Sequence, residues 1–155
     1  MEKESHLAAI MFTDLVGYSE LSQENEELAV ELLERHRKII REILPEHGGN
    51  EIKTIGDAFL IEFSSSIRAV KCAAEIQSRF FSYNNLQNKE KQIQLRIGIH
   101  LGDIMQDGDD IIGDGINIAS RIEPKENSGG ICISGQIYDQ VFNKVDFSYE
   151  ELKDV

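Results

Sequence analysis

The sequence predicts an α+β domain in which two helices cover one face of an antiparallel-rich sheet. Strand-like apolar runs and helical periodicity follow one another in the order β-α-β-β-α-β, and no internal repeat or linker interrupts them. The 155 residues are enough for one domain with a proper core. This order is that of the ferredoxin-like or palm arrangement. We therefore expect one domain over 1–155, with extra α/β elements after the sixth.

The first half of the chain supplies a strand, a helix and a hairpin. The continuous apolar run 6–15 predicts a central strand covered on both faces. Ser22 or Asn25 would cap the following helix, which Pro45 and the glycines beyond it would end. A hairpin is expected over 51–63, with its tight turn at Ile55-Gly56.

The second half begins with a helix over 65–83, which has an apolar stripe at helical spacing. An alternating pattern then predicts a strand over 93–100, followed by an acidic turn or flexible arm at 106–110. The remaining expected elements are a short helix over 115–122, a strand over 131–134 and a helix over 136–143.

Composition excludes several classes of protein. The net charge of −12 argues against a nucleic-acid surface, and a polyanionic substrate would need metal ions or local basic residues to bind. No apolar run is long enough to span a membrane, and the first residues do not form a signal peptide. Cys72 and Cys132 lie in apolar contexts and are expected to be buried free thiols. We therefore expect a cytoplasmic location.

Two aspartates follow strand-like runs. Asp14 ends the first apolar strand, and Asp57 follows the glycine of the hairpin turn. If these strand ends lie side by side, the two carboxylates could share Mg²⁺ ions, which bind carboxylates together with substrate phosphates. Each could instead be a turn aspartate that accepts bonds from backbone N–H groups.

Two further stretches suit phosphate. The junction Leu15-Val16-Gly17-Tyr18-Ser19 could bind phosphate through backbone N–H groups, although an ordinary strand–helix loop explains it equally well. On the expected helix over 115–122, Asn117 and Arg121 share a face. An amide and a guanidinium there suit a phosphoryl group that gains charge, and an ordinary surface helix is the alternative.

Lys53 and Asp110 could read adenine together. A lysine only donates and a carboxylate only accepts, so Lys53 would donate to ring N1 and Asp110 would accept from the 6-amino group. An exposed hairpin lysine and a loop aspartate are the alternative. His100 is expected to be structural, and His6, His36 and His47 form no cluster in the sequence, so no zinc site is predicted.

Four segments together resemble the class III nucleotidyl cyclases, the adenylate and guanylate cyclase catalytic domain. They occur in the order of that family and cover nearly the whole chain. The segments are Phe12-Thr13-Asp14-Leu15-Val16-Gly17-Tyr18-Ser19, Lys53-Thr54-Ile55-Gly56-Asp57-Ala58-Phe59, Arg96-Ile97-Gly98-Ile99-His100-Leu101-Gly102-Asp103, and 110–123.

The resemblance implies an adenylate cyclase that converts ATP into 3′,5′-cyclic AMP and pyrophosphate, a lyase reaction used in signal transduction. Asp14 and Asp57 match the residues that hold two divalent ions, Mg²⁺ or Mn²⁺, and the carbonyl of Leu15 would add a ligand. The remaining implied roles are triphosphate binding by Leu15, Val16, Gly17, Tyr18 and Ser19, adenine selection by Lys53 and Asp110, ribose orientation by Asn117, and transition-state stabilisation by Arg121.

The resemblance also implies a shared active site. In the family one domain supplies the metal-binding aspartates and a second supplies the other side chains, and here one chain carries both sets. A head-to-tail homodimer with two equivalent sites is therefore expected. Family members usually continue past this point with a further triphosphate-binding lysine, so we expect the closing strands to lie beyond Lys153-Asp154-Val155.

Other functions stay open at this point. A cyclase-like domain could bind nucleotide without turnover, or the chain could be a guanylate cyclase, a type that usually has a glutamate and a small residue in place of Lys53 and Asp110. A diguanylate cyclase is disfavoured because its Gly-Gly-Asp/Glu-Glu-Phe signature is absent from the hairpin.

Overall fold

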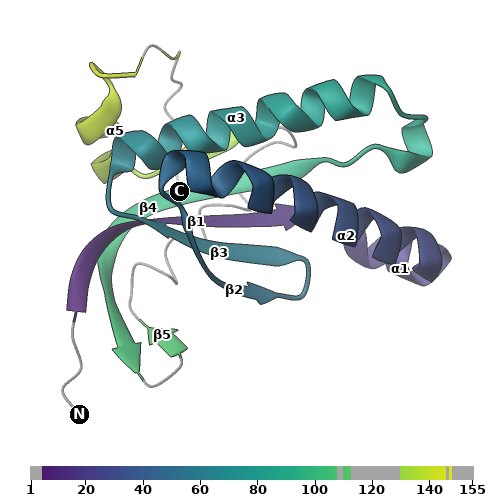
Figure 1. Cartoon of the computed structure of the whole chain (residues 1–155), viewed down its shortest axis with the longest axis horizontal. Helices are drawn as coiled ribbons and strands as arrows, with labels where there is room; N and C mark the ends of the chain where they lie inside the picture. The colour runs from purple at the N-terminus through teal and green to yellow at the C-terminus, as the bar shows by residue number, and fades with distance from the viewer. Residues whose placement is uncertain (1–4, 108–109, 113–129, 146, 148–155) are drawn as a thin grey trace.

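A computed structural model describes residues 5–107, 110–112, 130–145 and 147 of the chain (Figure 1). It confirms the α+β prediction. The strands lie in the order β2-β3-β1-β4-β5, all antiparallel to their neighbours, and β6 pairs with β4 in parallel. The order of the first four is that of the predicted ferredoxin-like core.

Most element bounds lie close to the predicted ones, and α1, β4 and β5 are the exceptions. The strands are β1 (Ser5–Leu15), β2 (Asn50–Ile55), β3 (Ala58–Phe63), β4 (Leu95–Asp107), β5 (Asp110–Ile112) and β6 (Ile131–Ile133). The α-helices are α1 (Tyr18–Glu24), α2 (Glu26–Ile43), α3 (Ser66–Asn85) and α5 (Gly135–Val141), and the 3₁₀ helices are η1 (Leu44–His47) and η2 (Lys89–Lys91).

The core lies between the sheet and the helices. Figure 1 shows α2 and α3 running over the same face of the sheet. Side chains alternate along β1, so that Ala9 and Met11 pack toward the helices while Ala8 and Ile10 belong to a smaller cluster on the other face. β1 is therefore buried on both faces, as its continuous apolar run predicts.

The helix expected before Pro45 is α2, and the short helix α1, which was not predicted, precedes it. The chain leaves the helical conformation at Asn25, whose backbone has φ −153° and ψ 88°. The Asn25 side chain accepts a hydrogen bond from the Leu28 N–H at 3.2 Å and caps α2. Of the two predicted caps, Asn25 is thus the one used, and Ser22 lies inside α1.

β4 extends beyond the expected strand over 93–100. It continues to Asp107 because β1 pairs with it as far as Met105 and β5 pairs with its last residues. Of the predicted acidic turn over 106–110, residues 106, 107 and 110 belong instead to the paired strands β4 and β5, and residues 108–109 lie outside the described part of the chain. The expected helix over 115–122 lies outside the described residues. Cys72 and Cys132 are buried and are not joined by a disulfide bond, as predicted, and no described helix could cross a membrane.

Candidate active site

Two carboxylates, those of Asp14 and Asp57, meet where the strands of the sheet end, and we call this place the carboxylate edge. β1 ends at Leu15, and β3 follows the turn at Gly56-Asp57. Because β1 and β3 are antiparallel, with Thr13 opposite Phe59, the end of β1 lies beside this turn. The Leu15 N–H donates to Asp57 Oδ2 at 2.9 Å. The strand ends of Asp14 and Asp57 are therefore side by side, and the backbone of one holds the carboxylate of the other.

The turn that carries Asp57 is held from a second side. Gly56 has φ +59°, a conformation that glycine adopts without steric cost. Arg37 on α2 donates from Nη2 to the Gly56 carbonyl at 2.8 Å. A hydrogen bond from a charged donor contributes about 1.5–3 kcal/mol. Asp57 is thus fixed by β1 through its side chain and by α2 through the preceding carbonyl.

Asp14 faces an arginine that the sequence did not identify as a site residue. Asp14 is opposite Arg96 in the register of β1 and β4, and Arg96 Nε lies 3.4 Å from Asp14 Oδ1. This ion pair lacks hydrogen-bond geometry, and Asp14 Oδ1 is buried and accepts no hydrogen bond from the described residues. A buried carboxylate oxygen with unused acceptor capacity suits a cation.

The junction after β1 is partly occupied by internal bonds. The Val16 N–H donates to the Gln94 carbonyl at 2.9 Å, and the Leu15 N–H is used by Asp57. Neither N–H is therefore available to a phosphate in this arrangement. Gly17 has φ +78° and turns the chain into α1, which begins at Tyr18 and places Ser19 in its first turn. The predicted phosphate contacts would thus have to come from Gly17, Tyr18 and Ser19.

Lys53 projects from the same face of the sheet as Asp14. It is opposite Leu60 in β3, and Leu60 is in turn opposite Phe12 in β1. Since alternate residues share a face, Phe12 and Asp14 lie on the face that carries Lys53. This is the face turned away from α2 and α3.

The other predicted site residues are only partly placed. Asp110 begins β5, at the opposite edge of the sheet from β2, and its side chain lies outside the described part of the chain. Figure 1 shows the end of β4 curving away from the helices and carrying β5 with it. Asn117 and Arg121 lie outside the described residues. The structure therefore places Asp14 and Leu15 beside Asp57, and places Lys53 on the same face as Asp14.

His100 fits the predicted structural role. It lies in β4 opposite Ile10 and is buried, and this burial lowers its pKa below the ordinary value for histidine. It is four residues from Arg96 along the strand, about 13 Å at strand spacing. A direct role at the carboxylate edge is not supported by this distance.

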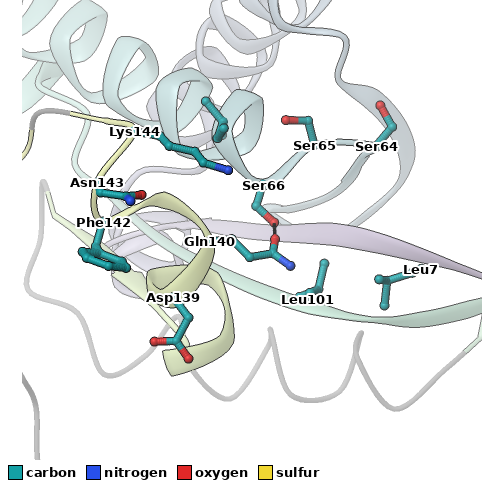
Figure 2. Close-up of a pocket in the computed structure, with 11 residues that line it drawn as sticks. Leu7, Ser64, Ser65, Ser66, Leu101, Asp139, Gln140, Phe142, Asn143 and Lys144 are labelled. Atoms are coloured by element: carbon teal, nitrogen blue, oxygen red, sulfur yellow. Dashed lines mark hydrogen bonds between the residues drawn. The ribbon is translucent and has the colours of Figure 1, made fainter.

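A cavity of about 620 Å³ lies elsewhere, beside the start of α3. Figure 2 shows Ser64, Ser65 and Ser66 on one side of it, and the side chain of Gln140 from α5 reaching Ser66, whose hydroxyl donates to Gln140 Oε1. Leu7, near the start of β1, also lines this cavity, whereas Asp14 lies near the end of that strand. The cavity is therefore separate from the carboxylate edge.

The fold is that of a palm-type domain, and two aspartates lie side by side at its carboxylate edge. The family model described as "Adenylate and Guanylate cyclase catalytic domain" matches residues 1–155, and the chain belongs to this family. The resemblance seen in the sequence is confirmed.

Relatives and solved structures agree with this family. A Rhizobium meliloti (strain 1021) protein provisionally named adenylate cyclase 3 is 38% identical over 100% of the chain, which spans 28% of that protein. A Podospora anserina adenylate cyclase is 27% identical over 87% of the chain, which spans 7% of it. The crystal structure of an adenylate/guanylate cyclase/hydrolase from Silicibacter pomeroyi superposes with a TM-score of 0.86 at 31% identity, covering 99% of this chain and 93% of that one.

Proposed function

We propose that the chain is the catalytic domain of an adenylate cyclase, which converts ATP into 3′,5′-cyclic AMP and pyrophosphate. The observation that supports this proposal is the hydrogen bond between the Leu15 N–H and Asp57, because it joins the end of the strand that carries Asp14 to the turn that carries Asp57. Membership of the cyclase family and relatives named adenylate cyclase support the reaction.

The donor atoms at this edge fit two Mg²⁺ or Mn²⁺ ions. Asp14 offers a buried oxygen that accepts no hydrogen bond from the described residues, and Asp57 uses Oδ2 for the backbone and retains Oδ1. Such ions, when bound, would lower the pKa of the ribose 3′-hydroxyl and offset charge on the departing pyrophosphate. The carbonyl of Leu15 is the further ligand that we propose.

The chain's cationic side chains would position the substrate. Arg96 places a guanidinium beside Asp14, where a triphosphate would also lie, and can neutralise part of its charge. Lys53 would donate to adenine N1 and Asp110 would accept from the 6-amino group. Asn117 would orient the ribose, and Arg121 would stabilise the charge that grows on the α-phosphate.

We propose that two copies of the chain share each site, head to tail. Asp14 and Asp57 of one protomer would then act with the Lys53, Asp110, Asn117 and Arg121 positions of its partner. The placement of Asp14 and Lys53 on one face of the sheet supports this, because that face could meet a second copy without displacing α2 or α3.

Cyclic nucleotide formation from ATP and from GTP, with Mg²⁺ or Mn²⁺, tests the reaction and its substrate. Cyclic AMP is the expected product, and specific activity should rise with protein concentration because the site needs two chains. Cyclic GMP as the main product would overturn the substrate assignment. Nucleotide binding without product, in this chain and in a longer form of it, would favour a silent cyclase-like domain.

Two sets of variants separate base reading from site sharing. Lys53→Glu combined with Asp110→Cys should shift preference from ATP toward GTP, and unchanged selectivity would contradict the base-reading roles. A mixture of Asp57→Ala and Arg121→Ala proteins should regain activity, since each heterodimer has one intact site. An inactive mixture in which heterodimers are detected would contradict the shared site.

A further inference from the structure

A second group of metal-binding side chains lies at the junction of η1 and α3. Glu46 and His47 are consecutive residues of η1, and Glu75 comes from α3. His47 Nε2 lies 2.5 Å from Glu75 Oε2. One donor atom from each of the three side chains lies within 4.8 Å of the other two. The histidine that forms no cluster in the sequence thus gains a partner 28 residues away.

The backbone under Glu46 and His47 is fixed by local structure. Pro45 occupies the start of η1, and Gly48 ends it with φ +68°. The Gly49 N–H then donates to the Leu44 carbonyl at 3.0 Å, and Leu44 is buried in the core. Gly49 itself lies so close to Phe63 that an added Cβ would be 2.9 Å from its ring. The turn therefore fixes the backbone that carries both side chains before any ligand arrives.

All three side chains of the group can be reached from solvent. Both carboxylates and His47 retain solvent access, with Glu46 exposed and the other two half-buried. Donors around a metal are commonly about 3 Å apart at ligand distances near 2 Å, so the present spacing needs only a small opening between His47 and Glu75. Arg79, one turn after Glu75 on α3, lies 3.3 Å from Glu42 and offers its charge there.

The donor types select the ion. An imidazole with two carboxylates suits Zn²⁺ and related late first-row divalent ions, whereas Mg²⁺ prefers oxygen ligands alone. Cys72 lies one turn before Glu75 on α3, but its side chain is fully buried in the hydrophobic core and is not one of the three donors that lie together. Water would complete the coordination sphere.

We propose that Glu46, His47 and Glu75 bind one Zn²⁺ or similar late first-row divalent ion. The ion would link the end of α2, through η1, to the middle of α3. It would also fix the start of β2, the strand whose other end leads to Asp57. β2 has six residues, so about 20 Å of strand separates this site from the carboxylate edge. The site would therefore stabilise the fold without touching the reacting groups.

Titration calorimetry with Zn²⁺, on the nucleotide-free chain in excess Mg²⁺, tests the proposal. We expect one Zn²⁺ equivalent that His47→Gln removes and that Glu75→Gln weakens by at least about tenfold. His6→Gln is the matched control. His6 Nε2 contacts Glu62 at 3.0 Å, but no third imidazole, carboxylate or thiol completes that pair among the described residues.

Co²⁺ absorption and thermal unfolding give independent readouts. Co²⁺ should show visible bands from nitrogen and oxygen coordination in the parent chain and in His6→Gln, and lose them in His47→Gln. Zn²⁺ should raise the unfolding temperature of the parent chain and of His6→Gln, but not that of His47→Gln. Zn²⁺ binding that survives both His47→Gln and Glu75→Gln, or no Zn²⁺ binding by the parent chain, would overturn the site. Circular dichroism shows whether His47→Gln and Glu75→Gln are folded. If one of them is not, Zn²⁺ binding by the other tests the site.

Discussion

The two ends of β2 bring carboxylates together in different ways. At the Asp57 end, Leu15 and Arg37 fix the carboxylate and its turn through the backbone, and Arg96 is a permanent cation beside Asp14. At the η1 end, the carboxylates of Glu46 and Glu75 meet an imidazole. Both ends are bounded by a glycine with positive φ, Gly56 and Gly48.

This difference indicates two kinds of ligand. Oxygen donors held by the backbone suit hard ions that also bind phosphate, and their geometry is set before substrate arrives. A mixed nitrogen and oxygen set on two helical segments suits a borderline ion that cross-links them. β2 thus separates an end whose donors suit ions that bind substrate phosphate from an end whose donors suit an ion that cross-links the fold.

Removing a carboxylate from the Asp57 end should have the largest effect. Asp57→Asn keeps an acceptor for the Leu15 N–H but loses the charge, so we expect cyclic nucleotide formation to fall by about a hundredfold or more, with an unchanged unfolding temperature. Asp103→Asn, an exposed aspartate on β4, is the matched control and should retain activity. Comparable losses in both variants would contradict the assigned role of Asp57.

The folded chain should lose stability at acidic pH because of a buried histidine in its core. His36 on α2 is buried against the rings of Phe59 and Phe80, and burial lowers its pKa from 6.5 to about 4. Its imidazole is therefore neutral in the folded chain, whereas the unfolded chain binds the proton below pH 6.5. Stability contributed by the neutral ring is complete above pH 6.5 and is lost as the pH falls toward 4.

The size of this loss can be measured by urea unfolding across that pH range. We expect His36 to account for up to about 3 kcal/mol of the decline, and His36→Leu should remove that part. His6→Leu changes an exposed histidine and should leave the decline unaltered. A His36→Leu variant with the full decline would show that other groups cause it.

The bond from Arg37 to Gly56 should matter less than Asp57 itself. Arg37→Met keeps the aliphatic stem but cannot donate, so the turn loses one of its two restraints. We expect kcat to fall by about tenfold, with a loss of about 1–2 kcal/mol of stability and no change in Zn²⁺ binding. Arg35→Met, on an exposed arginine of the same helix, controls for lost charge. Equal kcat values for the two variants would contradict a positioning role for Arg37.

The two glycines give the smallest and sharpest test. Ala at Gly56 meets no atom within 4 Å, and Ala at Gly48 meets only the flexible side chain of Arg68 at 3.2 Å, so both changes mainly add backbone strain of about 1 kcal/mol. Both variants should lose similar stability in denaturant unfolding. Only Gly56→Ala should reduce cyclase activity, and only Gly48→Ala should weaken Zn²⁺ binding. The opposite pattern would reverse the roles given to the two ends.

Much of the fold was predictable because periodicity reports it directly. The apolar run of β1 and the helical stripe of α3 need no long-range information. The start of α2 at Asn25 was one of two predicted starts, whereas the seven-residue helix α1 before it was not predicted. Asp14 and Asp57 were expected to be neighbours because each follows a strand-like run, and their strand ends were expected to lie side by side.

Contacts that depend on strand register or on the packing of distant elements could not be predicted from the sequence. Arg96 is opposite Asp14 only because β4 pairs with β1 in one register, and an arginine that opens an apolar strand was the one available signal. Glu75 reaches His47 only through the packing of α3 beside η1. The proposed roles of Asn117 and Arg121 still rest on the family resemblance alone.

The position of β1 has a consequence for how the chain is made. β1 is synthesised before both of its neighbours, since Ala9 pairs with Phe63 on one side and with Leu101 on the other. A nascent chain that ends before β4 therefore exposes one whole edge of an apolar strand, which can pair with another chain. Long sequence separation also slows folding. Aggregation during synthesis should thus be greatest before residue 107 leaves the ribosome.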